Sequence, residues 1–153
     1  MDFTTFKKWM IIALALLIFQ YHAGVTTNLF VIIPASNPLG ILIVPSALEF
    51  LLHIINGFVT LTIAMLFLVH AIRLRHRGLF YASLLGLAFV GVAIIAGFIF
   101  FLAGQDNTYS ITMGMSFISV FTIFFVELYI LGRIEKTGTE KTTVIGNSPE
   151  TAE

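Results

Sequence analysis

The sequence predicts an all-α fold, an integral membrane four-helix antiparallel bundle with both termini in the cytoplasm. The composition is the first reason, since 58% of the 153 residues are hydrophobic and 10% are charged, far from the averages of soluble domains. The second reason is that four apolar segments are each long enough, at about 1.5 Å per helical residue, to cross the ~30 Å of bilayer hydrocarbon. The third is that Lys and Arg gather in alternate connections.

The four predicted spans cover about residues 9–31, 47–71, 79–103 and 110–132, which together form one transmembrane domain, 9–132. Residues 1–8 form a short cytoplasmic lead. The first span resembles a signal peptide, but Tyr21 is too bulky for the −3 position of a cleavage after Ala23, so we expect an uncleaved helix.

The connections fix the predicted topology. Pro34, Pro38 and Pro45 break the chain into an external loop over 34–46, which carries no Lys or Arg. Basic residues occur in the lead, in the turn at 73–77 and just after the last span, so the positive-inside rule places these three in the cytoplasm. The segment 133–153 is polar and Thr-rich, and we expect a disordered cytoplasmic tail. The chain is thus predicted to be a multi-pass protein of the cell membrane.

The second span carries a polar face in its outer half. Its members follow one another at helical spacing: Glu49, His53, Asn56, Gly57 and Thr60. An ionisable group at membrane depth costs several kcal/mol unless it is paired, protonated or bound to a ligand. Glu49 and His53 are therefore candidate functional residues.

His22 and His53 are predicted to lie at a similar depth. His22 is roughly 20 Å above the inner boundary at Trp9, and His53 is roughly 9 Å below the outer end of its helix. Two imidazoles at one level on adjacent helices can hold a haem iron in a bundle. Met113 and Met115, near the outer end of the fourth span, offer thioether groups as further possible axial ligands.

Each candidate also has a structural explanation. His22 could hydrogen-bond a neighbouring helix, and Met113 and Met115 could simply fill the core. Glu127, in the inner part of the fourth span, is expected to pair with a cation or to be protonated, or to serve a proton path. The basic-turn residues and His70 are expected to determine topology, and these assignments remain open on the sequence alone.

Small residues recur along the third span and predict close helix packing. They are Ser83, Gly86, Ala93, Gly97 and Gly104. Such a face allows another helix to approach closely in lipid, and it predicts a homo-oligomer, most simply a dimer.

Two segments resemble the heme A synthase family. The run FQYHAGVTT at 19–27 is similar to the end of that family's first helix, and LEFLLHIING at 48–57 is similar to its second-helix segment of a glutamate, a histidine and a small residue. The resemblance implies a four-helix unit in which His53 binds haem and Glu49 is its catalytic neighbour. The pattern differs at the fourth helix, where the family has a histidine and this chain has Met113 and Met115.

The predicted function is a membrane protein that binds b-type or modified haem between the outer halves of its helices. His53 and His22 are the candidate iron ligands, Met113 and Met115 are alternatives for the sixth position, and Asn56 and Gly57 line the site. The role is then electron transfer with a redox partner, or haem modification as a heme A synthase-like oxidoreductase. The alternative is a non-haem tetraspan accessory subunit of a larger membrane complex.

Composition also excludes several classes. The chain has no cysteine, so it has no disulfide framework and cannot attach a c-type haem covalently. Only 8 residues are Lys or Arg and the net charge is zero, which argues against a nucleic-acid surface. The expected partners are membrane lipid, a second copy of the chain and an electron-transfer protein.

Overall fold

The computed structural model describes residues 3–33, 37–43 and 47–146 and is helical throughout its regular parts. Its elements are α1 (Phe3–Phe30), a short 3-10 helix η1 (Pro38–Ile43), α2 (Ala47–Leu74), α3 (Arg77–Leu102) and α4 (Asn107–Gly146). All four α-helices are long and apolar enough to cross a membrane. The all-α four-helix fold is therefore confirmed, while Pro34, Pro45 and the last residues of the predicted tail lie outside the described residues.

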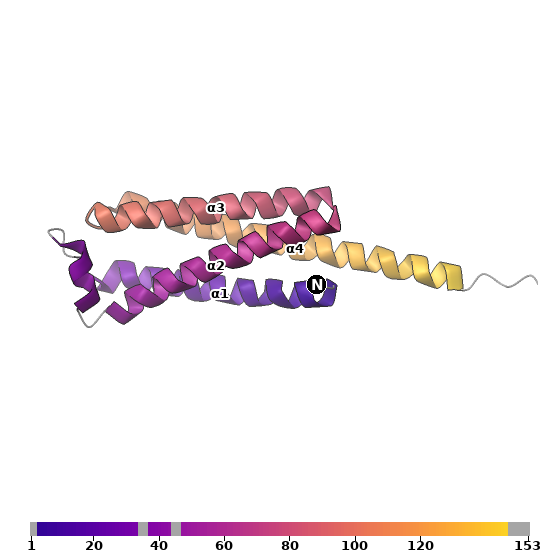
Figure 1. The fold of residues 1–153 in the computed structure, drawn as a ribbon, viewed down its shortest axis with the longest axis horizontal. Helices are drawn as coiled ribbons and strands as arrows, with labels where there is room; N and C mark the ends of the chain where they lie inside the picture. The colour runs from indigo at the N-terminus through magenta and orange to yellow at the C-terminus, as the bar shows by residue number, and fades with distance from the viewer. Residues whose placement is uncertain (1–2, 34–36, 44–46, 147–153) are drawn as a thin grey trace, which may run out of the picture.

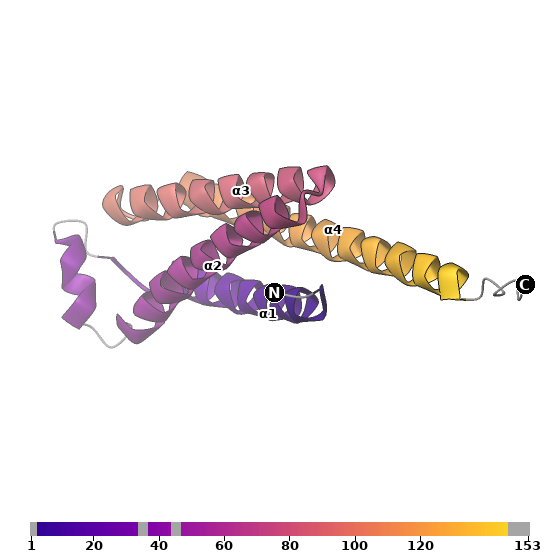
Figure 2. The ribbon, with the colours of Figure 1, turned by 45° about the vertical axis from the view of Figure 1, so that its right-hand side comes forward.

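The helices form a ring in which each packs against its neighbours in the chain, and α1 also packs against α4. The α3–α4 contact is the most extensive of these. Helix α2 crosses the bundle obliquely, so that its first turns lie beside α1 and its last turns lie beside α3 (Figures 1 and 2). The first half of α2 and the last half of α3 therefore lie apart from each other.

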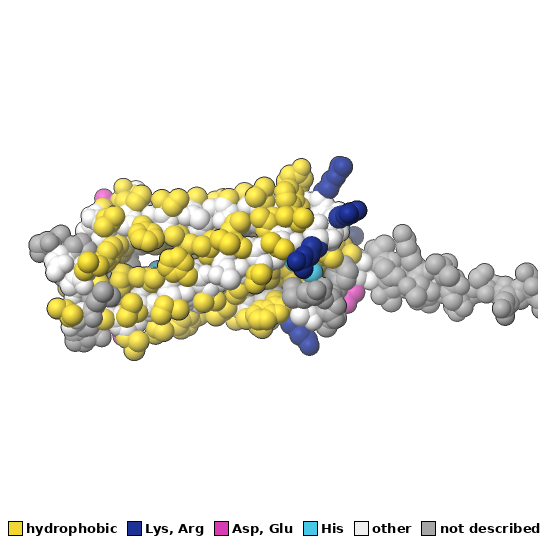
Figure 3. All heavy atoms as spheres, in the orientation of Figure 1, with side chains coloured by type: hydrophobic (Ala, Val, Ile, Leu, Met, Phe, Trp, Pro, Cys, Tyr) yellow, Lys and Arg dark blue, Asp and Glu magenta, His cyan; other side chains and the backbone are white. Residues whose placement is uncertain are grey.

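The two ends of the bundle differ in chemistry. Lys and Arg side chains gather at the end where α1 begins and α2 meets α3, which we call the basic end (Figure 3). The opposite end carries η1, and we call it the loop end (Figure 1). The start of α1 and the last turns of α4 both lie toward the basic end, as the predicted topology requires.

All four helices extend beyond the predicted spans at one end or both, and α1 and α4 do so by the most. Helix α1 already begins at Phe3, inside the predicted lead, and α4 continues to Gly146, where a tail without regular structure was expected from 133. Contacts between the two extensions explain part of the difference, because Lys7 forms an ion pair with Glu135 and Phe6 is fully buried. Charged residues can continue a helix past the membrane where another helix supports them.

The turns at both ends are stabilised by side chains. His76 precedes α3, and its Nδ1 accepts a hydrogen bond from the Leu79 N–H at 3.3 Å, as an N-cap does. At the other turn, the Thr108 N–H donates to Asp106 Oδ1 at 2.8 Å, and this bond lowers the pKa of Asp106. His76 therefore begins a helix, in addition to the topological role expected for it.

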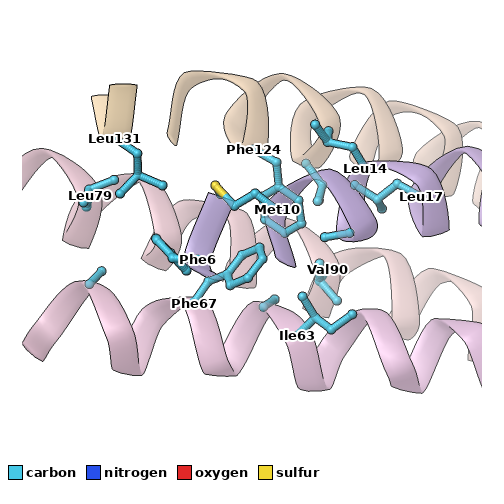
Figure 4. Packing of buried hydrophobic residues seen from close by; sticks show 14 residues of the cluster. Phe6, Met10, Leu14, Leu17, Ile63, Phe67, Leu79, Val90, Phe124 and Leu131 are labelled. Carbon is cyan, nitrogen blue, oxygen red and sulfur yellow. The ribbon is translucent and has the colours of Figure 1, made fainter. Parts of the chain in front are cut away.

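The main hydrophobic core lies in the half of the bundle nearer the basic end. It is built from all four helices, with Phe6, Met10 and Phe67 fully enclosed (Figure 4). A smaller cluster closes the loop end, formed by Val31, Ile33, Ile41, Phe50 and Phe100. The space between these two clusters contains the candidate site.

The small-residue face of α3 packs within the chain. A Cβ atom at Gly86 would meet Ile123 and Phe124 of α4 at 3.3 Å, and one at Gly97 would meet the Met113 sulfur at 3.3 Å. At Gly86 and Gly97 the face from which a homodimer was predicted is therefore occupied by α4, whereas a Cβ atom at Gly104 would meet nothing within 4 Å. The dimer stays a prediction.

Candidate intramembrane binding site

A cavity of about 410 Å³ lies between the main core and the loop-end cluster. Leu17, Val90 and Val120 of the main core line it on one side, and Ile41, Phe50 and Phe100 of the loop-end cluster line it on the other. All four helices contribute to its wall. Its volume falls within the range of roughly 300–1,000 Å³ that is common for small-molecule sites.

The wall is apolar apart from a small group of side chains. Aromatic residues dominate its loop-end part, with Phe98, Phe101 and Phe117 in addition to the two already named. The polar members are Gln20, Thr27, Asn28, His53 and Thr60. An apolar chamber with a few convergent polar groups is the usual form of a ligand-binding site.

His53 is the ionisable member of the wall. It lies one turn before Gly57 on α2, and its ring packs against Gly24 of α1, where an added Cβ would stand 3.0 Å from the ring Cε1. Its Nδ1 is buried and has no hydrogen-bond partner. A buried nitrogen without a partner costs free energy, and because the residue that carries it lines the cavity, His53 is the candidate ligand-binding residue.

Gln20 and Asn56 join α1 to α2 beside His53. The Asn56 amide donates to Gln20 Oε1 at 2.8 Å and to the Leu16 carbonyl at 3.1 Å. Gly57 leaves room for the Gln20 amide nitrogen, which would lie 3.4 Å from a Cβ atom at that position. Asn56 is thus a buried helix-joining residue, whereas Gly57 lines the cavity directly.

The structure does not bring His22 to His53. Gln20 faces the cavity, and His22, about 200° further round the helix, is exposed on the outside of the bundle. Its Nδ1 bonds within its own helix to the Ile18 carbonyl at 2.8 Å. His22 and His53 therefore do not face each other, and the similar depth predicted for them does not make them a ligand pair.

The two methionines separate in the same way. Met113 lines the cavity from α4, and its sulfur lies against Gly97. Met115 is 62% exposed and does not line the cavity. Of the four candidate iron ligands, the structure brings His53 and Met113 to one chamber.

Glu49 lies outside the chamber. It occupies the first turn of α2, where a negative charge is favoured by the helix dipole, and its side chain is exposed. It is absent from the cavity wall. The first turn of α2 thus gives Glu49 a structural explanation that needs no ligand.

Glu127 belongs to a different part of the bundle. It is fully buried between α3 and α4, and the Ser83 hydroxyl donates to its Oε1 at 2.5 Å, while Oε2 has no partner. No cation pairs with it among the described residues. Of the roles expected for Glu127, the structure favours a protonated carboxyl group that joins two helices.

The cavity opens sideways between α2 and α3. The lining residues that are also exposed on these helices are Leu51, Ile54 and Phe58 of α2 and Phe98 of α3. A hollow between hydrophobic side chains is visible in this half of the molecule (Figure 3). Since both helices are candidate membrane spans, this mouth faces lipid.

Two polar residues near the loop end did not emerge from the sequence. Thr27 lines the cavity with a buried hydroxyl that has no partner. Gln105 ties the α3–α4 turn to the end of α1, donating to the Val31 carbonyl at 2.6 Å and accepting from the Ile33 N–H at 3.1 Å. Thr27 falls one turn after the conspicuous Gly24, but no local pattern signals the distant contacts of Gln105.

Comparison with models of protein families, with curated proteins and with solved structures gives no match. The class of protein is therefore defined by the fold and the cavity. The chain is an integral membrane protein of four spanning helices with a lipid-facing chamber in one half.

Proposed function

We propose that the protein binds haem in this chamber, with His53 as an axial ligand of the iron. The observation that carries the proposal is that His53 lines the cavity and that its buried Nδ1, which lies beside Gly24, has no hydrogen-bond partner. Neutral imidazole is a common haem ligand and needs no buried counter-charge.

Met113 would be the second residue to hold the iron, because it lines the same cavity as His53. His53 comes from α2 and Met113 from α4, and these helices lie across the bundle from each other rather than as packed neighbours. A thioether opposite an imidazole is an established haem ligand pair. His22 and Met115 are exposed, so within one chain they are less suited to this role.

The remaining wall residues fit a flat apolar macrocycle with polar edges. The aromatic residues of the loop-end part offer faces for stacking, and Gly24 and Gly57 keep side chains out of the space beside His53. The unpartnered Thr27 hydroxyl and the Asn28 amide are the groups that would bind the haem carboxylates. Both lie near the end of α1, toward the membrane boundary.

A bound haem would supply one-electron transfer, which is the role we propose. The chain would contribute the two ligands, exclude water through the apolar wall and hold the ring in place. Haem modification, which the resemblance to heme A synthases implies, is less well supported, because Glu49 is exposed and does not line the cavity.

The test is the absorption spectrum of protein purified in detergent from a haem-replete host. We expect a Soret band that is lost in His53→Ala. His70→Ala is the matched control, since His70 lies outside this cavity, and it should leave the band unchanged. His22→Ala should also leave the band unchanged, whereas Met113→Leu should shift it.

The absence of a Soret band and of extractable haem in the parent protein would contradict the proposal. The accessory-subunit function would then be preferred. A Soret band retained in His53→Ala would show instead that haem binds at another place.

A further inference from the structure

A second cavity, of about 210 Å³, lies between α1 and α2 near the basic end. Its floor is formed by Ile63, Phe67 and His70, which are all buried. Trp9 stands on the α1 side, and Leu66, Val69 and Arg73 line the α2 side. None of the residues that line it also lines the larger cavity beside His53.

His70 lines this cavity and has a ring nitrogen without a hydrogen-bond partner. The residue is 7% exposed, and its Nε2 is buried without a hydrogen-bond partner. The ring is held by Phe6, whose centroid lies 4.4 Å from that of His70. A buried ring nitrogen in this position can donate to an oxygen atom of a ligand.

Arg73 gives the cavity a positive rim. It lies one turn after His70 on α2, and no acidic side chain pairs with it in the part of the chain that the structure describes. Other cations gather at the same end of the bundle (Figure 3). The expected ligand group is therefore an anion.

The rest of the wall is apolar and runs into the membrane span. Ile63, Leu66, Phe67 and Val69 extend from His70 toward the middle of α2. Trp9 is 47% exposed, as is typical of a tryptophan at the membrane interface. A ligand that filled this site would have an anionic head beside Arg73 and an apolar chain along α2.

We propose that this cavity binds an anionic phospholipid, with the phosphate held by His70 and Arg73 and an acyl chain lying along the apolar strip. Basic pockets between helices at the cytoplasmic boundary are suited to such headgroups. A free phosphate would leave the apolar strip uncovered, so the lipid is the better match. The proposal is independent of haem binding.

The chain offers a direct reporter, because Trp9 is its only tryptophan. The protein is reconstituted in vesicles in which a brominated lipid replaces part of the unlabelled lipid, and bromine quenches the fluorescence of a tryptophan that it contacts. We expect brominated phosphatidylglycerol to reach half-maximal quenching at a mole fraction about fivefold lower than brominated phosphatidylcholine, the preference that one basic side chain supplies.

Three variants separate a built site from general surface charge. Arg73→Gln should remove most of the preference, while Arg77→Gln, which loses the same charge outside the cavity, should keep it. His70→Phe, which keeps a ring to pack against Phe6, should weaken the preference. Inorganic phosphate in excess over lipid should not restore the fluorescence.

Equal quenching by the two lipids in the parent protein would overturn the proposal. If Arg73→Gln and Arg77→Gln lost the lipid preference equally, the proposal would also be overturned, because the preference would then come from the total charge of the basic end. Recovery of fluorescence with inorganic phosphate would show an anion site without a lipid chain.

Discussion

His53 occupies its position because the facing residue of α1 has no side chain. Its ring reaches within 3.0 Å of the point where a Cβ atom of residue 24 would stand. This is closer than most Cβ contacts in proteins, so a side chain at 24 would require the ring to shift by a few tenths of an ångström. The glycine therefore determines where the candidate iron ligand lies.

We expect Gly24→Ala to lower thermal stability in detergent. Alanine favours a helix interior by about 0.5–1 kcal/mol, but forcing an extra methyl group into a packed interface costs about 1–3 kcal/mol. The net loss should be about 1 kcal/mol, seen as a lower midpoint of thermal unfolding by circular dichroism.

Gly91→Ala is the control, because a Cβ atom there meets nothing within 4 Å. This variant should be as stable as the parent or slightly more so. Equal behaviour of the two variants would show that His53 does not lie against Gly24.

At the scale of the helices, the α1–α2 contact depends on a buried amide. Asn56 bonds both to the Leu16 carbonyl and to the Gln20 side chain, within one turn of α1. Such bonds hold helices in register where lipid gives no hydrophobic drive for association. They also place Gln20, rather than His22, toward the cavity.

Asn56→Ala should therefore weaken the α1–α2 contact. Interhelical hydrogen bonds in membranes contribute on average about 0.6 kcal/mol, and up to about 1.7 kcal/mol. We expect a loss of about 1 kcal/mol in the free energy of unfolding, measured by denaturant titration in mixed micelles.

Thr62→Val is the matched substitution on the same helix. The Thr62 hydroxyl is exposed and bonds only within α2, to the Phe58 carbonyl at 2.9 Å. The free energy of unfolding of Thr62→Val should stay close to that of the parent protein. A loss as large as that of Asn56→Ala would assign the effect to α2 itself and not to the contact between helices.

At the scale of the whole molecule, the chamber results from the oblique path of α2. This helix lies away from α3 at the loop end, and the cavity is lined by residues of the two diverging halves. The same divergence gives the cavity its lipid-facing mouth.

The distribution of charge over the whole molecule predicts that the N-terminus and the C-terminus both lie in the cytoplasm. The positive charges lie at one end of the bundle, and this end should face the cytoplasm. Reporter fusions after Glu153 and within 34–46 should give opposite signals in a periplasmic or external activity assay. The same signal from both sites would contradict the topology.

The sequence alone determined the four spans and their antiparallel order. Long uncharged apolar segments must be helical in a bilayer, because every backbone polar group needs an internal partner there. It also predicted that the polar face of α2 turns inward, which holds for His53, Asn56, Gly57 and Thr60 but not for Glu49, which is exposed. These conclusions depend on residues that are close in the chain.

Only the tertiary structure decided which face of each other helix turns inward. The rotation of α1, set by Asn56 and Gly24, points Gln20 inward and His22 outward. The packing of α3 on α4 covers the small-residue face, and Gln105 joins segments far apart in the chain. In apolar helices every face is compatible with lipid, so hydrophobic patterning cannot fix the rotation, and a few close contacts between helices determine the site.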